Sequence, residues 1–483
     1  MHDSSDHPTR GASSSSPPDA PPQTRQLGSQ KSGRAASSGP ERKKTADIHI
    51  LRPFAPGSDE SIVQFSFQIE NFPHIQYAYG SVVGLEALDG VRRIASDIIG
   101  SDGTVLVDAN GALRILVRDP ASLGGGVLSD ACQRLVEAFC EALPMVALHT
   151  SAGPICLWVS GAWSISNRPA ADGTQTSSET GGTSLRFAGG SPQEDAAWAD
   201  RYRADMALVV TVMTALERAF AGHAEQLALF WQPVCDGERV LYREALVRFI
   251  DANGVARSPA DEILALERLG FIRFLDRYVV ARVVAELEDS SNVSLGVNIS
   301  AQSVRGDCWW DDVVHRLNRR NDVANRLILE ITETTTFPNM SEAVRFTARM
   351  RRLGCKVALD DFGMGFTSVR QILALSPDIV KLDRFFLRRA GLSAKDRATF
   401  LHLAQFAQSM DVTVVVEGVE TQSQAKLVHE AGVRWQQGYY WGRPTTSRAW
   451  LAQAFDTAPA ARISDGSPIA GADTVPSSVE VGL

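Results

Sequence analysis

Short runs of apolar residues recur through the second half of the chain, and stretches with helical spacing separate them. Val293–Val297 and Val412–Val416 are two such runs, and Ala260–Glu288 and Met340–Leu353 are helical stretches. Short apolar runs of this kind are typical of buried parallel strands. Repeated βα units over the segment from about 226 to 456 favour a parallel (β/α)8 barrel of the TIM type, and therefore an α/β fold.

By this interpretation, polar side chains close the barrel strands. They are a carboxylate, an amide or a lysine in each case: Glu244, Asn298, Glu330, Asp360 with Asp361, Lys381 and Glu417. The C-terminal ends of the strands meet on one face of a barrel, where the active sites of this fold lie. Two like charges about 4 Å apart repel by roughly 4 kcal/mol at an effective dielectric near 20, and a divalent cation is the simplest remedy. The pattern predicts a metal-dependent enzyme.

The segment from about 47 to 205 has a different, mixed pattern that predicts a smaller α+β domain. The expected elements are a strand at Ile62–Ile69, a helix at Val83–Ile99, a hairpin at Gly103–Val117, a helix at Leu128–Leu143 and a strand near Ile155–Val159. Asn110-Gly111 is a strong turn signal for the hairpin. A loop rich in Gly, Ser and Thr, from about 166 to 192, is expected to be mobile. A long helix from Trp198 to Phe220 follows, and the segment from 206 to 225 is expected to link the two domains.

Length, composition and charge limit the class of protein. With 483 residues, 44% apolar and 22% charged, the chain is expected to form two soluble globular domains. Residues 1–46 and 457–483 are poor in large apolar residues and are expected to be disordered tails. The net charge of -8 disfavours DNA as a partner. No apolar run approaches the roughly 20 residues of a membrane span, no signal-peptide pattern is present, and the six cysteines show no CxxC spacing, so a cytoplasmic location is expected.

A set of motifs in the second half resembles one known family. The first is Tyr242-Arg243-Glu244-Ala245-Leu246-Val247-Arg248-Phe249. The others follow in that family's order: Trp231-Gln232-Pro233, Val297-Asn298-Ile299-Ser300, Glu330-Ile331-Thr332-Glu333, Asp360-Asp361-Phe362-Gly363, Lys381-Leu382-Asp383, Glu417-Gly418-Val419-Glu420-Thr421 and Gln437-Gly438-Tyr439-Tyr440. Together they resemble the EAL family of cyclic-di-GMP phosphodiesterases over essentially all of 226–456.

The resemblance implies a role for each matched residue. Glu244, Asn298, Glu330 and Asp360 would hold one ion, and Asp360, Asp361 and Glu417 a second. An oxygen-rich set suits Mg²⁺ or Mn²⁺. Lys381, with Glu244 and Glu417, would be catalytic, and Lys381 would position or deprotonate the attacking water. Gln232, Arg248 and Gln437 would bind the substrate, with Gln437 also supporting the water around the second ion. The implied reaction converts cyclic-di-GMP to linear pGpG, and the implied assembly is a homodimer.

Departures from the family pattern leave other functions open. Glu333 matches a glutamate that clamps the loop after Asp361, but Met364 and Phe366 replace a small residue and a tyrosine in that loop. A barrel that binds cyclic-di-GMP, or another protein, without turnover is therefore one alternative. A different metal-dependent barrel enzyme, such as an enolase-like lyase, is another. It would account for the carboxylates but not for Gln232, Arg248 and Gln437 in the family's arrangement.

The first domain, over 62–160, resembles a GGDEF-type cyclase that has lost its site. Gln68-Ile69-Glu70-Asn71-Phe72 stands where that family has its metal-binding aspartate motif, and Leu85 replaces an aspartate that contacts guanine. Ala109-Asn110-Gly111-Ala112-Leu113 replaces Gly-Gly-Asp-Glu-Phe at the hairpin. Cyclisation of GTP needs metal-binding carboxylates on the triphosphate. The resemblance therefore implies an inert, degenerate GGDEF domain that acts as a regulatory or dimerisation element, with GTP as a possible ligand.

Overall fold

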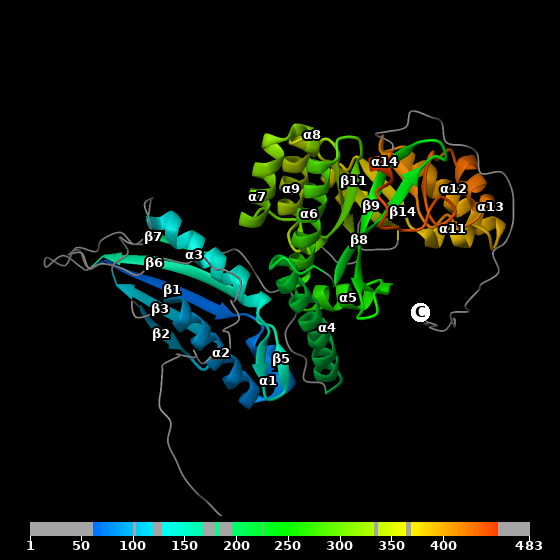
Figure 1. The fold of residues 1–483 in the computed structure, drawn as a ribbon. Coiled ribbons are helices and arrows are strands. Elements are labelled where there is room, and N and C mark those ends of the chain that lie inside the picture. The colour runs from blue at the N-terminus through cyan, green and yellow to red at the C-terminus, as the bar shows by residue number, and fades with distance from the viewer. Residues whose placement is uncertain are drawn as a thin grey trace, which may run out of the picture. The chain divides into compact units, whose positions relative to one another are not determined.

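The computed structural model describes residues 61–99, 103–118, 128–167, 179–182, 196–224, 226–332, 337–363 and 369–452 (Figure 1). The chain divides into two units, Met1–Thr45 and Ala46–Leu483, and every described residue belongs to the second. The expected tails at 1–46 and 457–483 lie outside the described residues, as do Glu333, Met364 and Phe366.

An antiparallel five-stranded sheet forms the framework of the first domain, in the order β2-β3-β1-β6-β7. Its strands are β1 (Ser61–Ile69), β2 (Gly103–Val107), β3 (Ala112–Arg118), β6 (Val159–Asn167) and β7 (Glu179–Gly182). The accompanying elements are α1 (Phe72–Tyr79), α2 (Ser81–Ile99), α3 (Leu128–Ala142), the 3-10 turn Leu143–Met145 and a small hairpin of β4 (Leu148–Thr150) and β5 (Gly153–Ile155). The expected strand, hairpin and helices are therefore confirmed to within two residues at their starts.

Alternating burial explains the central strand of this sheet. Val63, Phe65, Phe67 and Ile69 are buried, and the residues between them are half-buried. This period of two is what a strand with one face against a core requires. The β2–β3 hairpin turns at Gly111, whose φ of +85° lies in the region that favours glycine.

Two expectations for the first domain were wrong. The expected single strand near Ile155–Val159 is the end of β5 and the start of β6, and Cys156, Leu157 and Trp158 between them are buried without strand pairing. Part of the expected loop at 166–192 is strand instead, because β7 pairs with β6, whereas residues 168–178 and 183–192 lie outside the described residues. The Gly-rich sequence of β7 gives no strand signal. Glycine is required at position 181, because an added Cβ would lie 2.6 Å from Trp163 Nε1.

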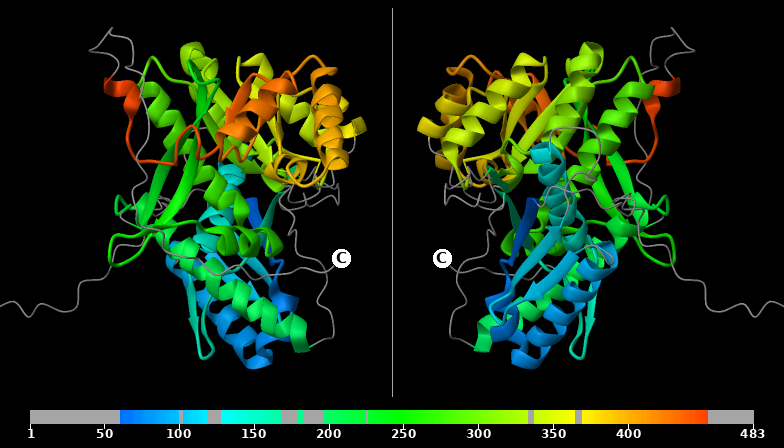
Figure 2. Two further views of the ribbon diagram at one scale, coloured as in Figure 1. Left: turned by 90° about the vertical axis from the view of Figure 1, so that its right-hand side faces the viewer. Right: turned by 90° about the vertical axis from the view of Figure 1, so that its left-hand side faces the viewer.

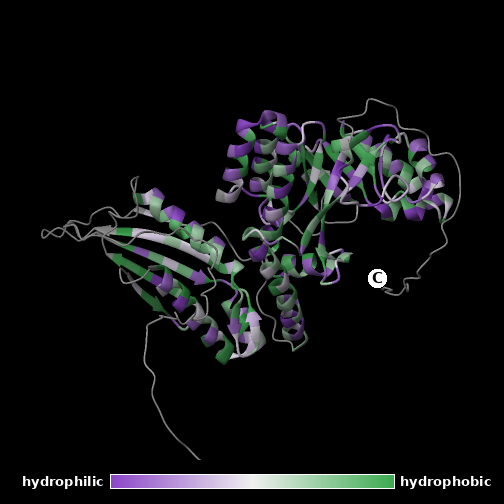
Figure 3. Cartoon of the chain, viewed as in Figure 1, coloured by the Kyte–Doolittle hydropathy of each residue, from purple (hydrophilic) through white to green (hydrophobic). Residues whose placement is uncertain are grey.

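The long helix α4 (Ala196–Phe220) follows, two residues longer at its start than expected. Its buried residues include Tyr202, Met206, Val209 and Leu216, which recur at helical spacing. Figure 3 shows the corresponding alternation of hydrophobic and hydrophilic colour along the helix.

Eight strands form the closed barrel of the second domain. They are β8 (Leu227–Cys235), β9 (Val240–Ile250), β11 (Leu295–Ser300), β12 (Leu327–Thr332), β13 (Lys356–Phe362), β14 (Ile379–Leu382), β15 (Thr413–Val416) and β16 (Trp435–Gln437). The sheet runs in this order, β8 pairs with both β9 and β16 to close it, and the short β10 (Ala256–Arg257) extends it at β9. Figure 2 shows helices packed around these strands.

The barrel is not wholly parallel, which corrects the sequence-based expectation. β8 pairs antiparallel with β9 and with β16, whereas the pairings from β9 through β11 to β16 are parallel. A tight turn at Asp236-Gly237 joins β8 directly to β9, and Gly237 has a φ of +96°. An Asp-Gly pair between two apolar runs is a hairpin signal. It could have been used to predict from the sequence that β8 and β9 are antiparallel.

The barrel helices are α5 (Ala260–Arg268), α6 (Ile272–Asp289), α7 (Cys308–Arg319), α8 (Asn321–Ala324), α9 (Met340–Arg352), α10 (Val369–Leu375), α11 (Arg384–Ala390), α12 (Ala394–Gln408), α13 (Gln422–Glu430) and α14 (Ala449–Ala452), with a 3-10 turn at Ala301–Ser303. The expected single helix over Ala260–Glu288 is two helices. Gly270, at φ +78°, breaks it and turns the chain between α5 and α6. Among the described residues, no helix combines the length and apolarity that crossing a membrane requires.

Candidate active site inside the barrel

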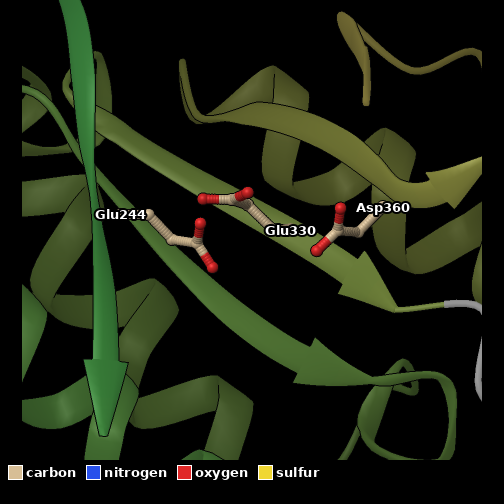
Figure 4. Close-up of side chains that lie close together, drawn as sticks. All are labelled: Glu244, Glu330 and Asp360. Carbon is tan, nitrogen blue, oxygen red and sulfur yellow. The ribbon is translucent and has the colours of Figure 1, made fainter. Parts of the chain in front are cut away.

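Carboxylates from neighbouring strands converge inside the barrel. One oxygen each from Glu244, Glu330 and Asp360 lies within 4.8 Å of the others, and the same holds for Asp360, Asp361 and Glu417. Figure 4 shows the first three side chains turned toward one another from β9, β12 and β13. Asp360 belongs to both groups, as a carboxylate that bridges two cations would.

Glu244, Glu330, Asp360 and Asp361 lie within their strands, whereas Glu417 directly follows β15. Glu244 is the fifth residue of the eleven-residue β9, and the strand continues to Ile250. Parallel pairing places Glu244 opposite Gly296 and Asn298 opposite Glu330. The sequence-based expectation that Glu244 closes its strand is therefore wrong, because β9 continues to pair with β8 from Ala245 to Phe249.

Gly296 makes room for Glu330. A Cβ at position 296 would lie 1.9 Å from Glu330 Oε1 and 2.7 Å from the Tyr242 ring. The Tyr242 hydroxyl donates to Glu330 Oε2 at 3.2 Å. Glu330 is fully buried, so its position depends on a glycine on the neighbouring strand and on the tyrosine that holds it.

Lys381 lies at the centre of the carboxylates and is fully buried. Its Nζ is 2.7 Å from Glu330 Oε2 and from Glu417 Oε1, and 3.3 Å from Glu244 Oε2 and from Asp360 Oδ1. One ammonium therefore faces four carboxylates. Even with Lys381 charged, the group carries an excess of negative charge if all four are ionised, and this arrangement attracts further cations.

Burial and mutual repulsion give the carboxylates of the site different pKa values. Burial raises the pKa of Glu330 to about 8, against the opposing effect of Lys381, and repulsion from Glu244 adds to the rise. Burial raises the pKa of Asp361 to about 7, with a further contribution from Asp360. Glu244 is the exception, because its pKa is lowered. Burial works to raise this pKa, but Lys381 and the hydrogen bonds from Gln437 and Asn298 outweigh the effect of burial. For Lys381, burial works against the charge, but the surrounding carboxylates outweigh it and raise the pKa well above the ordinary lysine value.

Asp361 has an unusual backbone. Its φ of +57° lies in the left-handed region, which few residues other than glycine adopt. The pairing between β13 and β14 shifts register at this point, between Leu359 and Phe362. Backbone strain of this kind is concentrated at functional sites. Here it accompanies the placement of two consecutive aspartates in the same group.

Three amides complete the polar lining. The Asn298 Nδ2 group donates to Glu244 Oε1 and the Gln437 Nε2 group to Glu244 Oε2. Gln437 Nε2 also lies 3.4 Å from Gln232 Oε1, and Gln232 Nε2 donates to the Gly442 carbonyl at 3.1 Å. Asn298 Oδ1, Gln437 Oε1 and Glu330 Oε1 are buried and accept no hydrogen bond within the described part of the chain.

These unpartnered oxygens test whether the site fits a metal ion. A buried oxygen without a donor is costly, and coordination to a cation removes that cost. The acidic groups and amides supply only oxygen, and neither cysteine nor histidine occurs in the two groups. This ligand chemistry fits a hard ion such as Mg²⁺ or Mn²⁺ better than zinc.

Two cavities meet at Asp360. One, of about 350 Å³, is lined by Gln232, Glu244, Asp361, Glu417 and Gln437, together with residues not identified from the sequence: Asp383, Arg384, Glu420 and Tyr439. The other, of about 220 Å³, is lined by Arg248, Asn298 and Asp360. Arg248 is thus separated from Gln232, and its Nη1 donates to the Val247 carbonyl at 2.9 Å. The structure brings together nine predicted residues directly and places Arg248 in the adjoining cavity, whereas Glu333 lies outside the described residues.

Tyr242 and Gly296 were missed from the sequence. A period-two signal was present for Tyr242, because it precedes Glu244 by two residues on the same strand and so shares its face. The requirement for Gly296 depends on the pairing register of β9, β11 and β12, and no short sequence pattern reveals it.

Comparisons with known proteins agree with this geometry. Residues 213–444, just under half of the chain, match the family model described as EAL domain. The chain is 32% identical over 250 residues to "Cyclic di-GMP phosphodiesterase NbdA" of Pseudomonas aeruginosa, covering 49% of this chain and 32% of that protein. It is 28% identical over 250 residues to "Cyclic di-GMP phosphodiesterase PdeB" of Shewanella oneidensis, covering 50% of this chain and 29% of that protein.

The chain therefore spans about a third of the length of these curated relatives. A solved structure described as "PaMucR Phosphodiesterase, c-di-GMP complex" is 25% identical, and the match covers 51% of this chain and 99% of that chain with a TM-score of 0.45.

Proposed function

We propose that the barrel hydrolyses cyclic-di-GMP to linear pGpG with the help of two divalent cations, Mg²⁺ or Mn²⁺. The observation that carries this proposal is the convergence of Glu244, Glu330, Asp360, Asp361 and Glu417 around the buried Lys381. The match of residues 213–444 to the EAL domain, and two similar proteins whose names state this activity, support the choice of substrate.

Each of the two acidic groups would supply ligands for one of the two ions. Glu244, Asn298, Glu330 and Asp360 would hold one ion, and Asp360, Asp361 and Glu417 the other. When bound, such a pair of ions orients a scissile phosphate and lowers the pKa of a water molecule. The buried oxygens of Asn298 and Glu330 that lack donors support this assignment.

Lys381 contributes positive charge. Because the surrounding carboxylates raise its pKa well above the ordinary lysine value, we assign it to charge stabilisation and positioning rather than to proton abstraction. Gln232 and Gln437 would contact substrate in the larger cavity, and Arg248 would bind a phosphate oxygen from the adjoining one, which its planar guanidinium suits.

Binding of cyclic-di-GMP without turnover fits these residues less well. A pure receptor does not need the buried acidic groups, whose mutual repulsion is unfavourable unless cations occupy the site. All the residues that the resemblance assigns to the metals are present in this chain.

For the first domain we propose an inert, GGDEF-like regulatory role. Gln68 stands where a metal-binding carboxylate is expected, and its Nε2 donates to the Asn110 carbonyl at 3.1 Å. Asp108, near the hairpin turn, accepts from the backbone amides of Asn110 and Ala112, at 2.9 and 3.0 Å, and so stabilises the turn. We expect no cyclic-di-GMP from GTP and Mg²⁺, and detection of that product would overturn this assignment.

One assay tests the proposed function. The purified full chain is incubated with cyclic-di-GMP and Mg²⁺, with and without GTP, and pGpG is followed by chromatography. We expect pGpG with Mg²⁺ and none with a chelator. Tight binding of cyclic-di-GMP without any product would favour the receptor instead. A change in rate on adding GTP at constant free Mg²⁺ would support binding of GTP to the first domain.

A further inference from the structure

Two buried carboxylates lie outside the candidate metal groups, where α5 meets α6. Glu267 is 5% exposed and Asp276 is 6% exposed, although neither has a role in the proposed chemistry. Burying a carboxylate is costly unless its hydrogen bonds are satisfied. Asp276 has no cationic partner among the described residues, and its hydrogen-bond donors, the Ser300 backbone N–H and the Ser303 hydroxyl, are neutral.

Both carboxylates bind the same serine. Glu267 Oε1 accepts from Ser300 Oγ at 2.9 Å, and Asp276 Oδ2 accepts from the Ser300 backbone N–H at 2.9 Å. Asp276 Oδ2 also accepts from Ser303 Oγ at 2.7 Å, and Gln302 Nε2 donates to the Glu267 carbonyl at 2.9 Å. We call Glu267, Asp276 and Ser300 the carboxylate clasp. It fixes both the main chain and the side chain at the end of β11.

The clasp acts on a strand that carries a candidate metal ligand. Ser300 follows Asn298 by two residues in β11, so the main-chain position of one constrains the other. Asn298 donates through Nδ2 to Glu244 and keeps its Oδ1 free of hydrogen bonds with the described residues. Displacement of the strand end would move that oxygen away from the acidic groups.

A shared cavity supports the connection. Glu267 and Asp276 line the same 220 Å³ cavity as Asn298 and Asp360. The clasp therefore borders the proposed substrate and metal site. Glu262 lies on α5 like Glu267 and is 3% exposed, but it pairs with Arg257 and is not among the residues that line the cavity.

We propose that Glu267 and Asp276 are positioning residues for Asn298, acting through Ser300 to hold the end of β11 where the Asn298 oxygen completes the metal site. This inference rests on the proposed function for its ligand but not for its geometry. Groups that support metal ligands in this way typically change metal affinity by about 10–100-fold when they are removed.

The test compares Glu267→Ala, Asp276→Ala and Ser300→Ala in the full chain with the matched control Glu262→Ala. Mn²⁺ affinity is measured by calorimetry, and amide hydrogen exchange is followed in peptides that cover residues 295–304. We expect the three clasp variants to weaken Mn²⁺ binding by about tenfold and to exchange faster in that segment, and the control to do neither. Asp276→Asn, which keeps an acceptor, should restore most of the loss.

Unchanged Mn²⁺ affinity and unchanged exchange in the three clasp variants would overturn the proposal. If Asp276→Ala does not fold, Ser300→Ala decides the question through the other contact, because it removes the hydroxyl that donates to Glu267 and keeps the backbone N–H that donates to Asp276. Ser300→Ala combined with Glu267→Ala should weaken Mn²⁺ binding no more than the stronger single variant, and multiplied effects would contradict a shared route. Because exchange needs no substrate, loss of the proposed hydrolytic function in the wild type would not be mistaken for failure of the clasp.

Discussion

Lys381 Nζ lies 2.7 Å from Glu330 Oε2, and neither side chain is exposed to solvent. Three further carboxylates, from Glu244, Asp360 and Glu417, lie within 3.3 Å of the same nitrogen. Without divalent ions, Lys381 is the cation that offsets the repulsion among these groups. It therefore has a structural role in addition to the charge stabilisation proposed for the reaction.

Lys381→Met should destabilise the metal-free protein. Removing one partner of a buried ion pair typically costs about 3–5 kcal/mol, because it leaves uncompensated buried charge. The measurement is the free energy of unfolding in chelator, with the exposed Lys356→Met on β13 as the control. Mg²⁺ should recover part of the loss in Lys381→Met. Equal stability of the two variants in chelator would contradict this role.

Gly296→Ala should disturb Glu330 directly. The added Cβ would lie 1.9 Å from Glu330 Oε1, so the carboxylate must move. We expect turnover to fall by at least about tenfold and metal binding to weaken, as loss of a ligand position implies. Gly306→Ala is the matched control, because nothing lies within 4 Å of a Cβ there. The interpretation fails if the two alanine variants behave alike.

The raised pKa of Asp276 should make the free energy of unfolding depend on pH. Burial raises its pKa from 3.8 to about 7, although the hydrogen bonds from Ser303 and Ser300 oppose the shift. The folded state then holds this proton more tightly than the unfolded chain. The contribution is fully present below about pH 4 and is lost as the pH rises through about 7.

We therefore expect the free energy of unfolding of the wild type to fall more steeply than that of Asp276→Asn between about pH 4 and pH 8. Urea denaturation at several pH values, in chelator, measures both slopes. Since other buried acids titrate in both proteins, the difference between the slopes isolates Asp276. Parallel curves would show that its pKa is not raised.

Trp158 of the first domain packs against aromatic residues of the barrel domain. Its ring packs edge-on against Phe271 and Phe274, at centroid distances of 5.6 and 5.8 Å, and its backbone N–H donates to Asn71 Oδ1 at 2.9 Å. Phe271 and Phe274 lie between Glu267 and Asp276 in sequence. A change at Asn71 or Trp158 therefore reaches the helices that hold the clasp.

Trp158→Ala should raise the Mg²⁺ concentration that gives half-maximal hydrolysis. Trp163→Ala is the control, since Trp163 is buried in the same domain and donates to Gln133 there. Melting temperatures of both variants separate general destabilisation from this specific effect. An equal response in the two variants would leave no special role for Trp158.

The positions of most strands and helices were predictable because their signals are local. Apolar runs and helical spacing identified Leu295–Ser300 and Met340–Arg352 closely. The antiparallel β8 was missed although Asp236-Gly237 signalled it, because repeated βα units favoured a uniform parallel barrel. The division of α5 from α6 was missed because apolar spacing continues across Gly270.

The site shows the same division between local and non-local signals. Motif order identified Glu244, Glu330 and Asp360, and the structure brings them together. The contributions of Tyr242 and Gly296 follow from strand register. The separation of Arg248 from Gln232 depends on how cavities form between strands and helices. Such relationships join residues far apart in the chain, so no local pattern contains them.

Single-turnover hydrolysis of cyclic-di-GMP by the wild type, Glu244→Gln and Glu262→Gln, with Mg²⁺ in excess and pGpG quantified, decides whether the acidic groups around Lys381 form the catalytic site. Both variants neutralise a buried glutamate of the barrel, but only Glu244 lies in the acidic group. The account predicts that Glu262→Gln forms pGpG at the wild-type rate and that Glu244→Gln falls to background. Product formation by Glu244→Gln at the rate of the other two proteins would contradict it.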